Sequence, residues 1–341
     1  SSIASGSGTI TSLVFTGGYG GTVYGIKVDG NVLVDQGPLV TAQAAFPNGL
    51  YWIKDRDNAN EHQLLWAGGG SSVITIPGVS KPDDTTYSAP SGNSVAWCWK
   101  AGDSAASNSD GTISSTVRTN TDAGFSIVTW SGTGTAGSIG HGLGRDIDII
   151  IVTSTNATGG VSRFLWHSSL SPADQQLYLQ NADAVTNTPD LWDTGTFNSS
   201  TFSVGTDQHT NSSGNNYVAF CWGAVPNYSA FGSFTGNGSA DGPFIYTGMR
   251  PSFLLLKNTS VSENWLLYDT TRSPNNPVDE TLYPSLTFAE QTGVGLQYVD
   301  ILSNGFKIRT TSINASGNNY VYMCFAENPF GGQNTPPATA R

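Results

Sequence analysis

Charged side chains are scarce in this sequence. Asp, Glu, Lys and Arg make up 11% of the 341 residues, against roughly 25% in a typical soluble domain. The chain has 14 basic and 25 acidic residues, which gives a net charge of −11. Because no run of Lys or Arg offsets this negative charge, the composition argues against nucleic acid and anionic membrane surfaces as partners.

Long apolar runs are absent and cysteines are few. No run approaches the roughly 20 residues of a membrane-spanning helix, so no membrane insertion is expected. The three cysteines, Cys98, Cys221 and Cys324, are an odd number at matching places in a repeated stretch. Such positions usually lie farther apart than the ~4.4–6.8 Å between Cα atoms that a disulfide requires. Their spacing also fits no metal site, so the sequence predicts three free, buried thiols.

Glycine and aromatic residues, in contrast, are abundant. Gly accounts for 41 residues, and Phe, Trp and Tyr for 11% of the chain. The aromatic content supplies enough apolar area to exclude a disordered chain. Many glycines together with few charges favour all-β modules with numerous turns over a helical enzyme.

One stretch of sequence occurs three times in the chain. Residues 213–222 read Ser-Gly-Asn-Asn-Tyr-Val-Ala-Phe-Cys-Trp, residues 316–325 repeat the pattern, and residues 91–99 form a looser, shorter copy. Each copy is a turn signal that leads into aromatic and β-branched residues, which is typical of a strand. A long fixed period indicates repeated structural units.

Alternation divides each copy into two uncharged faces. We therefore expect a central strand that is covered on both sides, with its bulky face toward a core. The bulky face holds Val95, Trp97, Trp99, Val218, Phe220, Trp222, Val321, Met323 and Phe325, and the other face holds Ala96, Cys98, Tyr217, Ala219, Cys221, Tyr320, Tyr322 and Cys324.

The predicted fold class is all-β, with tandem β-sandwich (jelly-roll-like) repeats and Gly-rich turns. The first strands include a hairpin in which residues 24–28 and 32–34 flank a turn. Residues 1–37 are expected to be N-terminal strands, either a remnant or the end of a preceding β domain, or strands added to the first repeat. An abbreviated first repeat (38–102) and a linker (103–123) follow, and 112–117 within the linker could form a strand. The remaining units are a second β-sandwich repeat (124–225), a third β-sandwich repeat (226–330) and a C-terminal tail (331–341).

The repeats also test for catalytic residues, because a histidine of one unit can be compared with the matching position of the next. His141 lies in Gly-His-Gly, where the third unit has Tyr-Thr-Gly, and His62, His167 and His209 likewise find no matching histidine. No Ser–His–Asp arrangement or nucleophile elbow is recognisable. We therefore expect no enzyme, no catalytic residue and no cofactor.

Three further candidates have ordinary structural interpretations. Asp183, Asp190 and Asp193 cluster in a loop, but they lack the spacing of an EF-hand, so no metal is expected. The glycines of 132–134 and 236–238 lack the strand-to-helix setting of a phosphate-binding loop and are read as turns. Trp192 and Tyr178 are loop aromatics that could stack on sugars, although the sequence does not separate them from core residues.

A group of motifs carries a family resemblance. Residues 124–134 (Gly-Phe-Ser-Ile-Val-Thr-Trp-Ser-Gly-Thr-Gly), 141–144 (His-Gly-Leu-Gly), 213–219 and 326–330 (Ala-Glu-Asn-Pro-Phe) together resemble a repeat domain of tail-fibre-like virion proteins of marine cyanobacterial tailed phages. The resemblance covers about residues 46–341. It implies a virion protein that is assembled in the bacterial host cytoplasm, and it supplies no catalytic residue.

On this basis we expect a non-enzymatic tail fibre or receptor-binding protein, or alternatively a capsid-attached head fibre or decoration protein. A tailspike-type depolymerase and a secreted adhesin or glycan-binding module are the rival classes. Other virion proteins and a host surface glycan or receptor are the expected partners. A homo-oligomer is also expected, a trimer by family analogy alone, because no heptad stalk is present.

Overall fold

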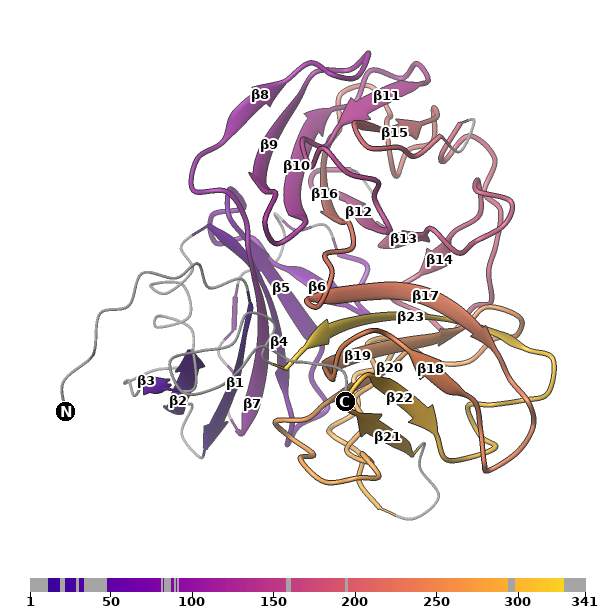
Figure 1. The fold of residues 1–341 in the computed structure, drawn as a ribbon. Coiled ribbons are helices and arrows are strands. Elements are labelled where there is room, and N and C mark those ends of the chain that lie inside the picture. The colour runs from indigo at the N-terminus through magenta and orange to yellow at the C-terminus, as the bar shows by residue number, and fades with distance from the viewer. Residues whose placement is uncertain are drawn as a thin grey trace.

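The computed structural model describes residues 48–80, 82, 87–88, 90, 92–157, 161–193, 196–293 and 298–327, and the backbone alone of residues 12–18, 22–28 and 31–33. The regular elements of this part of the chain are β-strands, and their ladders are antiparallel (Figure 1). The predicted all-β class is thereby confirmed. No helix in the described ranges has the length and hydropathy needed to cross a membrane.

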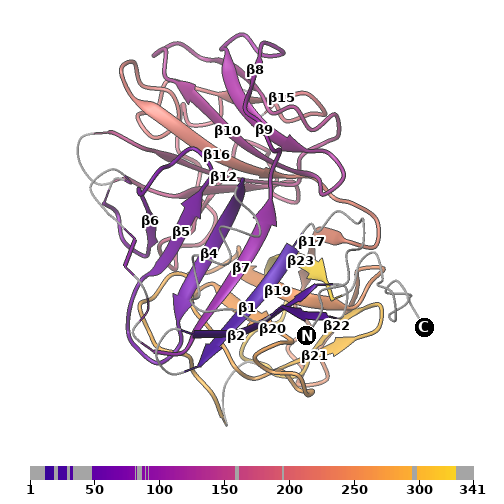
Figure 2. The same cartoon turned by 90° about the vertical axis from the view of Figure 1, so that its left-hand side faces the viewer.

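The first sheet has the strand order β3-β2-β1-β7-β4-β5-β6, and β1, β7, β4, β5 and β6 lie side by side in Figure 2. Strand β1 pairs directly with β7, so the N-terminal strands join this sheet as the added strands that the sequence offered as one alternative. The predicted hairpin is confirmed by the pairing of β2 with β3. The strands are β1 (Ser12–Gly18), β2 (Thr22–Val28), β3 (Asn31–Leu33), β4 (Gly49–Asp55), β5 (His62–Trp66), β6 (Ile74–Ile76) and β7 (Ser94–Lys100).

The second sheet has the order β14-β13-β12-β16-β10-β9-β8, and a two-stranded sheet, β11-β15, accompanies it. The expectation of a linker at 103–123 is wrong, because β8 and β9 lie in that segment and extend this sheet from β10. Their polar sequence reflects exposure of one face, not a lack of structure. The strands are β8 (Ala106–Asn108), β9 (Ser115–Asn120), β10 (Phe125–Ser131), β11 (Gly137–Gly140), β12 (Ile149–Ser154), β13 (Phe164–His167), β14 (Leu177–Tyr178), β15 (Thr201–Val204) and β16 (Asn216–Trp222).

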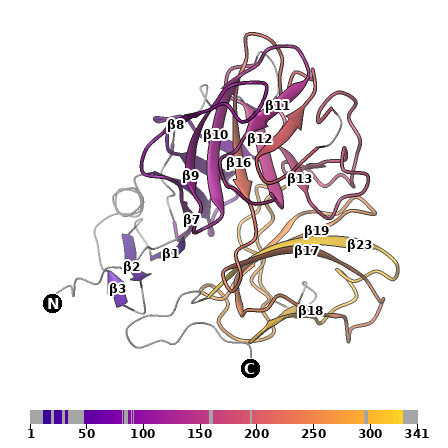
Figure 3. The ribbon, with the colours of Figure 1, turned by 45° about the horizontal axis from the view of Figure 1, so that its top comes forward.

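The third sheet has the order β17-β23-β19-β20, and a small sheet, β18-β22-β21, accompanies it. In Figure 3, β18 of this small sheet lies in a layer below β17, β19 and β23. The predicted C-terminal tail, 331–341, lies outside the described residues. The strands are β17 (Ser229–Thr235), β18 (Phe244–Tyr246), β19 (Pro251–Asn258), β20 (Leu266–Asp269), β21 (Val299–Leu302), β22 (Gly305–Ile308) and β23 (Asn319–Ala326).

The repeated stretch occupies the same place in each of the three larger sheets. It forms β7, β16 and β23, each of which has a strand on both sides, as predicted for a central strand. The registers also agree. Cys98 pairs with Leu13 and Tyr51, Cys221 with Ser126 and Ile150, and Cys324 with Ala230 and Leu254.

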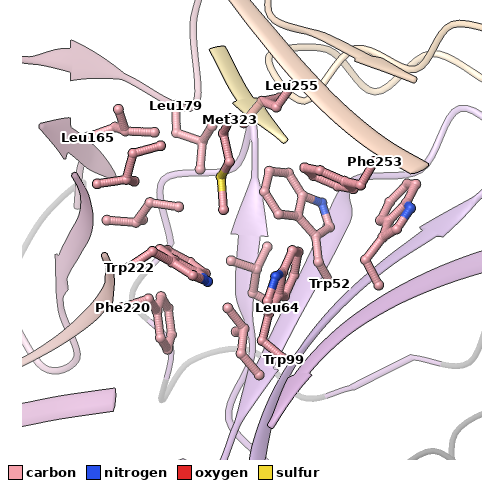
Figure 4. Packing of buried hydrophobic residues seen from close by; sticks show 14 of the residues in the cluster. Trp52, Leu64, Trp99, Leu165, Leu179, Phe220, Trp222, Phe253, Leu255 and Met323 are labelled. Atoms are coloured by element: carbon pink, nitrogen blue, oxygen red, sulfur yellow. The ribbon is translucent and has the colours of Figure 1, made fainter. Parts of the chain in front are cut away.

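The bulky faces of β7, β16 and β23 do face a core, but they share one. Their nine bulky residues belong to a single cluster, the central core, to which all three larger sheets contribute (Figure 4). The predicted tandem β-sandwich repeats would each enclose an interior of their own. The observed arrangement instead buries the large aromatic residues between units, where three faces together exclude water from more apolar area than one face could.

The smaller faces of β16 and β23 line two separate interiors. Tyr217, Ala219 and Cys221 pack in the second core, between the second sheet and β11-β15. Tyr322 and Cys324 pack in the third core, between the third sheet and β18-β22-β21. Two sheets that pack across an apolar interior form a sandwich, so the predicted β-sandwich class is consistent with these two parts of the chain.

Buried cations tie the three larger sheets together in a ring. The Lys54 Nζ on β4 donates to the Thr287 carbonyl at 3.4 Å, in the loop that follows β20 of the third sheet. The Lys257 Nζ on β19 donates to the Ala182 carbonyl at 3.0 Å, in a loop of the second sheet. The Arg163 Nη2, next to β13, donates to the Ser80 carbonyl beside the first sheet. Each sheet therefore holds a loop of another by a charge-assisted hydrogen bond.

Candidate functional site

His141, the histidine that the sequence singled out, is a buried structural residue. Its Nε2 lies 3.0 Å from the Asn198 carbonyl, and its Nδ1 accepts from the Leu143 N–H at 3.2 Å. Burial lowers the pKa of the imidazole, and the two partners fit the neutral ring with its proton on Nε2. Both ring nitrogens therefore hold backbone groups.

The other histidines also have structural partners. The Nε2 of buried His167 lies 3.1 Å from the Tyr322 carbonyl and links the second sheet to the third. The Trp52 indole donates to the Nδ1 of His62 at 2.9 Å. His209 pairs with Asp207 at 2.8 Å. The four histidines are thus separate, and each one supports the loop or sheet next to it.

The three loop aspartates do not assemble into a metal site. Asp183 accepts from the Asn181 amide at 2.7 Å, whereas Asp190 and Asp193 adopt left-handed backbone conformations with φ of 63° and 51°. No group of three or more His, Cys, Asp or Glu side chains suited to a metal ion is found in the described ranges. Trp192 is buried in the second core and Tyr178 is partly buried beside it, so neither is an exposed stacking residue.

The two glycine-rich segments are turns, as predicted, and their glycines are required by close approach. A Cβ on Gly132 would lie 2.2 Å from the Ser212 carbonyl oxygen, and a Cβ on Gly236 would lie 2.2 Å from that of Ala315. In each segment, an asparagine at the corresponding position binds the residue after the first glycine. Asn211 accepts from the Thr133 N–H, and Asn314 accepts from the Asn237 N–H, both at 2.9 Å.

The densest group of charges lies between the first and third sheets. The buried guanidinium of Arg272 contacts Asp269 and Glu290, both at 2.5 Å. Glu290 also contacts Arg56 at 2.5 Å, and Arg56 lies 3.5 Å from Glu280. The two carboxylates around Arg272 outweigh its burial and raise its pKa. We name these five residues the charge clasp. The three carboxylates of the charge clasp pair with its two arginines, as expected for ion pairs that hold two segments of a protein together.

A different kind of site lies on the small sheet of the third sandwich. Phe244 and Tyr246, two residues apart on β18, point to the same outer face and are 44% and 64% exposed, while Ile245 between them is buried. A Cβ on Gly305 would lie 3.0 Å from the Phe244 ring, and one on Gly248 would lie 3.7 Å from the Tyr246 hydroxyl. Each ring therefore lies against a glycine, which has no side chain that would displace the ring. We name Phe244 and Tyr246 the aromatic platform.

The second sandwich provides an internal comparison for this platform. Ile139 of β11 pairs with Phe202 as Ile245 pairs with Phe306, so the positions of Phe244 and Tyr246 correspond to Ser138 and Gly140. The β11 edge is also covered, since the Ile113 N–H donates to the Ser138 carbonyl at 3.0 Å. The exposed aromatic pair is therefore particular to the third sandwich among these two.

Charges next to the platform are compensated. Lys307, the cross-strand partner of Phe244, contacts Asp241 at 2.9 Å. Arg309 contacts Asp300 at 3.4 Å. The surface around the two rings thus combines apolar faces with paired charges and no net local charge, which suits a neutral ligand better than an ionic one.

Sequence reasoning missed the aromatic platform. The signal was present in the repeats, because Phe-Ile-Tyr of the third unit stands where the second has Ser-Ile-Gly. Alternation around a buried Ile places both aromatic rings on the outer face. The charge clasp left no such signal, since Arg56 lies 234 residues before Glu290 and meets it only through the packing of two sheets.

Comparison with protein-family models matches residues 69–329 to a family described as "Domain of unknown function (DUF7483)". No curated protein and no solved structure matches the chain. The matched range includes the second and third sheets, both of their small sheets, and β6 and β7 of the first sheet. Because the match covers more than half of the sequence, the chain belongs to the DUF7483 family.

Proposed function

We propose that this chain is a non-enzymatic structural protein of a tailed-phage virion, a tail fibre or receptor-binding adhesin that contacts the host cell surface. The virion assignment rests on the motif group of residues 124–134, 141–144, 213–219 and 326–330, which resembles the repeat domain of tail-fibre-like virion proteins. The matching places of β7, β16 and β23 further support an origin by internal repetition.

The packing suits a protein that must stay folded outside the cell. The central core joins three sheets, and buried cations and the charge clasp connect them again at their periphery. Since each sheet needs the other two to bury its bulky face, unfolding of one sheet exposes apolar area on all three. The histidines are used as structural hydrogen-bonding groups, which favours a non-enzymatic role.

The observation that carries the contact role is the aromatic platform. Two neighbouring rings with open faces, backed by glycines and flanked by compensated charges, form a surface on which sugar rings can stack. Aromatic side chains offer large contact area with little conformational entropy to lose. We propose a neutral glycan of the host surface as the ligand of this platform.

Localisation on the particle tests the virion assignment. Antibodies against the purified chain, applied to intact phage and viewed by electron microscopy, are expected to label the tail fibres. Label on the capsid would instead support the alternative, a capsid-attached head fibre or decoration protein. Particles without label would contradict a role in the virion.

Incubation with host surface polysaccharide tests the non-enzymatic role. The purified chain is expected to bind the polysaccharide and to leave its length distribution unchanged. Shortened chains would overturn the proposal in favour of a tailspike-type depolymerase.

A further inference from the structure

Strand β17 is an unusually long edge strand. The three larger sheets end in β3, β6, β8, β14, β17 and β20. Five of these have two to four residues, whereas β17 has seven. Natural sheets commonly keep their edges short because unpaired backbone groups attract other strands. The third sheet departs from this rule at β17 alone.

The other two larger sheets cover the corresponding edge with further strands. Ala230 of β17, Ser126 of β10 and Leu13 of β1 each pair with the cysteine of the repeated stretch. Beyond β10 the sheet continues into β9 and β8, and beyond β1 it continues into β2 and β3. In the described residues nothing continues the third sheet beyond β17.

The free backbone groups of β17 can be assigned. At its two ends, the Ala326 N–H donates to the Tyr228 carbonyl and the Gly236 N–H donates to the Asn318 carbonyl, both at 2.8 Å. Backbone groups of successive residues in a strand point in alternate directions, so between Tyr228 and Gly236 the N–H and C=O groups of the even-numbered residues point toward β23. The N–H and C=O groups of Phe231, Ser233 and Thr235 therefore point away from the sheet, and within the described ranges they meet no backbone partner.

The usual protective devices are also missing from this edge. The sequence Ser-Ala-Phe-Gly-Ser-Phe-Thr contains no charged residue and no proline, and its ladder with β23 runs without a register shift. Lysine, proline and bulges are the features that normally discourage pairing at an edge. An edge of this length without any of them is suited to receive another strand.

We propose that β17 pairs antiparallel with β17 of a second copy of this chain. Length favours this occupant, since every other edge strand of the larger sheets is at most four residues long. Charge favours it as well, because two chains of net charge −11 can approach most closely through an uncharged strand. A strand that pairs antiparallel with its own copy forms a closed twofold dimer. The outward-pointing backbone groups belong to Phe231, Ser233 and Thr235, so the pairing is centred on Ser233, which lies opposite Ser233 of the second copy.

Sedimentation velocity over a concentration series tests this dimer. The wild-type chain is expected to shift from monomer to dimer, and added salt is expected to favour the dimer by screening the net charge. Ser233→Pro removes one outward N–H and spares the ladder with β23, a position that edge strands tolerate. Ser233→Lys adds a charge at the same exposed position. Both variants are expected to remain monomeric.

Matched variants separate loss of pairing from loss of folding. Thr116→Lys adds the same charge at an exposed position of β9, which is already paired on both sides, and it is expected to leave the dimer intact. Ser233→Cys is expected to cross-link two copies under oxidation, since the three native thiols are buried. A wild-type chain that stays monomeric, or a dimer that survives both Ser233→Pro and Ser233→Lys, would overturn the proposal.

Discussion

The indole of Trp99 packs edge-on against the indole of Trp222, with ring centroids 5.6 Å apart, although the two residues belong to different sheets. Phe325, at the matching place of the third sheet, lies 5.5 Å from Trp99. The last bulky residues of the three copies of the repeated stretch thus meet in the central core. The three sheets share one interior at this point, which ties their stabilities together.

Trp99→Ala is therefore expected to destabilise the whole chain. Removing a buried tryptophan from a packed core costs about 3–5 kcal/mol, and Trp99 also contacts Phe253. The free energy of unfolding from urea titration measures this loss, and a single cooperative transition is expected. Trp99→Phe should cost less, because it keeps an aromatic ring and removes a buried indole N–H that has no hydrogen-bond partner. A separate early transition for one sheet would contradict the shared core.

Arg272→Met is expected to destabilise the joint between the first and third sheets. It leaves Asp269 buried without its cation and leaves Glu290 with Arg56 alone. Breaking a buried ion pair by removing one partner costs about 3–5 kcal/mol. Adding Asp269→Asn and Glu290→Gln to Arg272→Met should recover part of the loss, because it removes the two carboxylate charges that Arg272 had balanced. Thermal unfolding of the single and triple variants provides the measurement. A triple variant less stable than the single one would argue against a charge clasp.

Stability is expected to fall as the pH is lowered from 6.5 toward 4. Burial lowers the pKa of His167 to about 4, and it also lowers that of His62. In this window the unfolded chain takes up protons that the folded chain does not, so acid favours unfolding. The contribution of His167 alone is about 3 kcal/mol at most. In His167→Gln, whose side-chain amide retains a donor and an acceptor, the urea midpoint should depend less on pH across this range.

Replacement of the aromatic platform should separate binding from folding. The double variant Phe244→Ser with Tyr246→Gly copies the residues found at the corresponding positions of the second sandwich. Because both side chains are exposed, the loss of stability is expected to be limited to about 1–2 kcal/mol, the cost of placing Ser and Gly in a strand. Retention on host polysaccharide, measured by affinity electrophoresis, should be lost. Phe288→Ala, another exposed aromatic position, serves as the control and should leave retention unchanged.

The three thiols are expected to be unreactive in the folded chain. Cys98, Cys221 and Cys324 are buried, and burial raises the pKa of each thiol. Since the thiolate is the reactive form, a thiol reagent such as Ellman's reagent should label none of them before denaturation and all three afterwards. Fast labelling of the native chain would contradict the described packing.

The sequence by itself determined the strands and their faces. The repeated stretch predicted a central strand in each sheet, and period-two alternation separated Trp97 and Trp99 from Cys98 correctly, because side-chain direction along a strand is a local property. The turns at Gly132 and Gly236 were readable for the same reason.

Only the tertiary structure decided where those faces lie. Alternation shows that Trp222 faces an apolar environment, but it does not tell whether that environment belongs to one unit or to several. The sequence of 103–123 predicts a linker because a partly exposed strand next to β10 has the polar composition of a loop. The charge clasp and the free edge of β17 depend on how separate segments pack, and this long-range geometry leaves no local pattern in the chain.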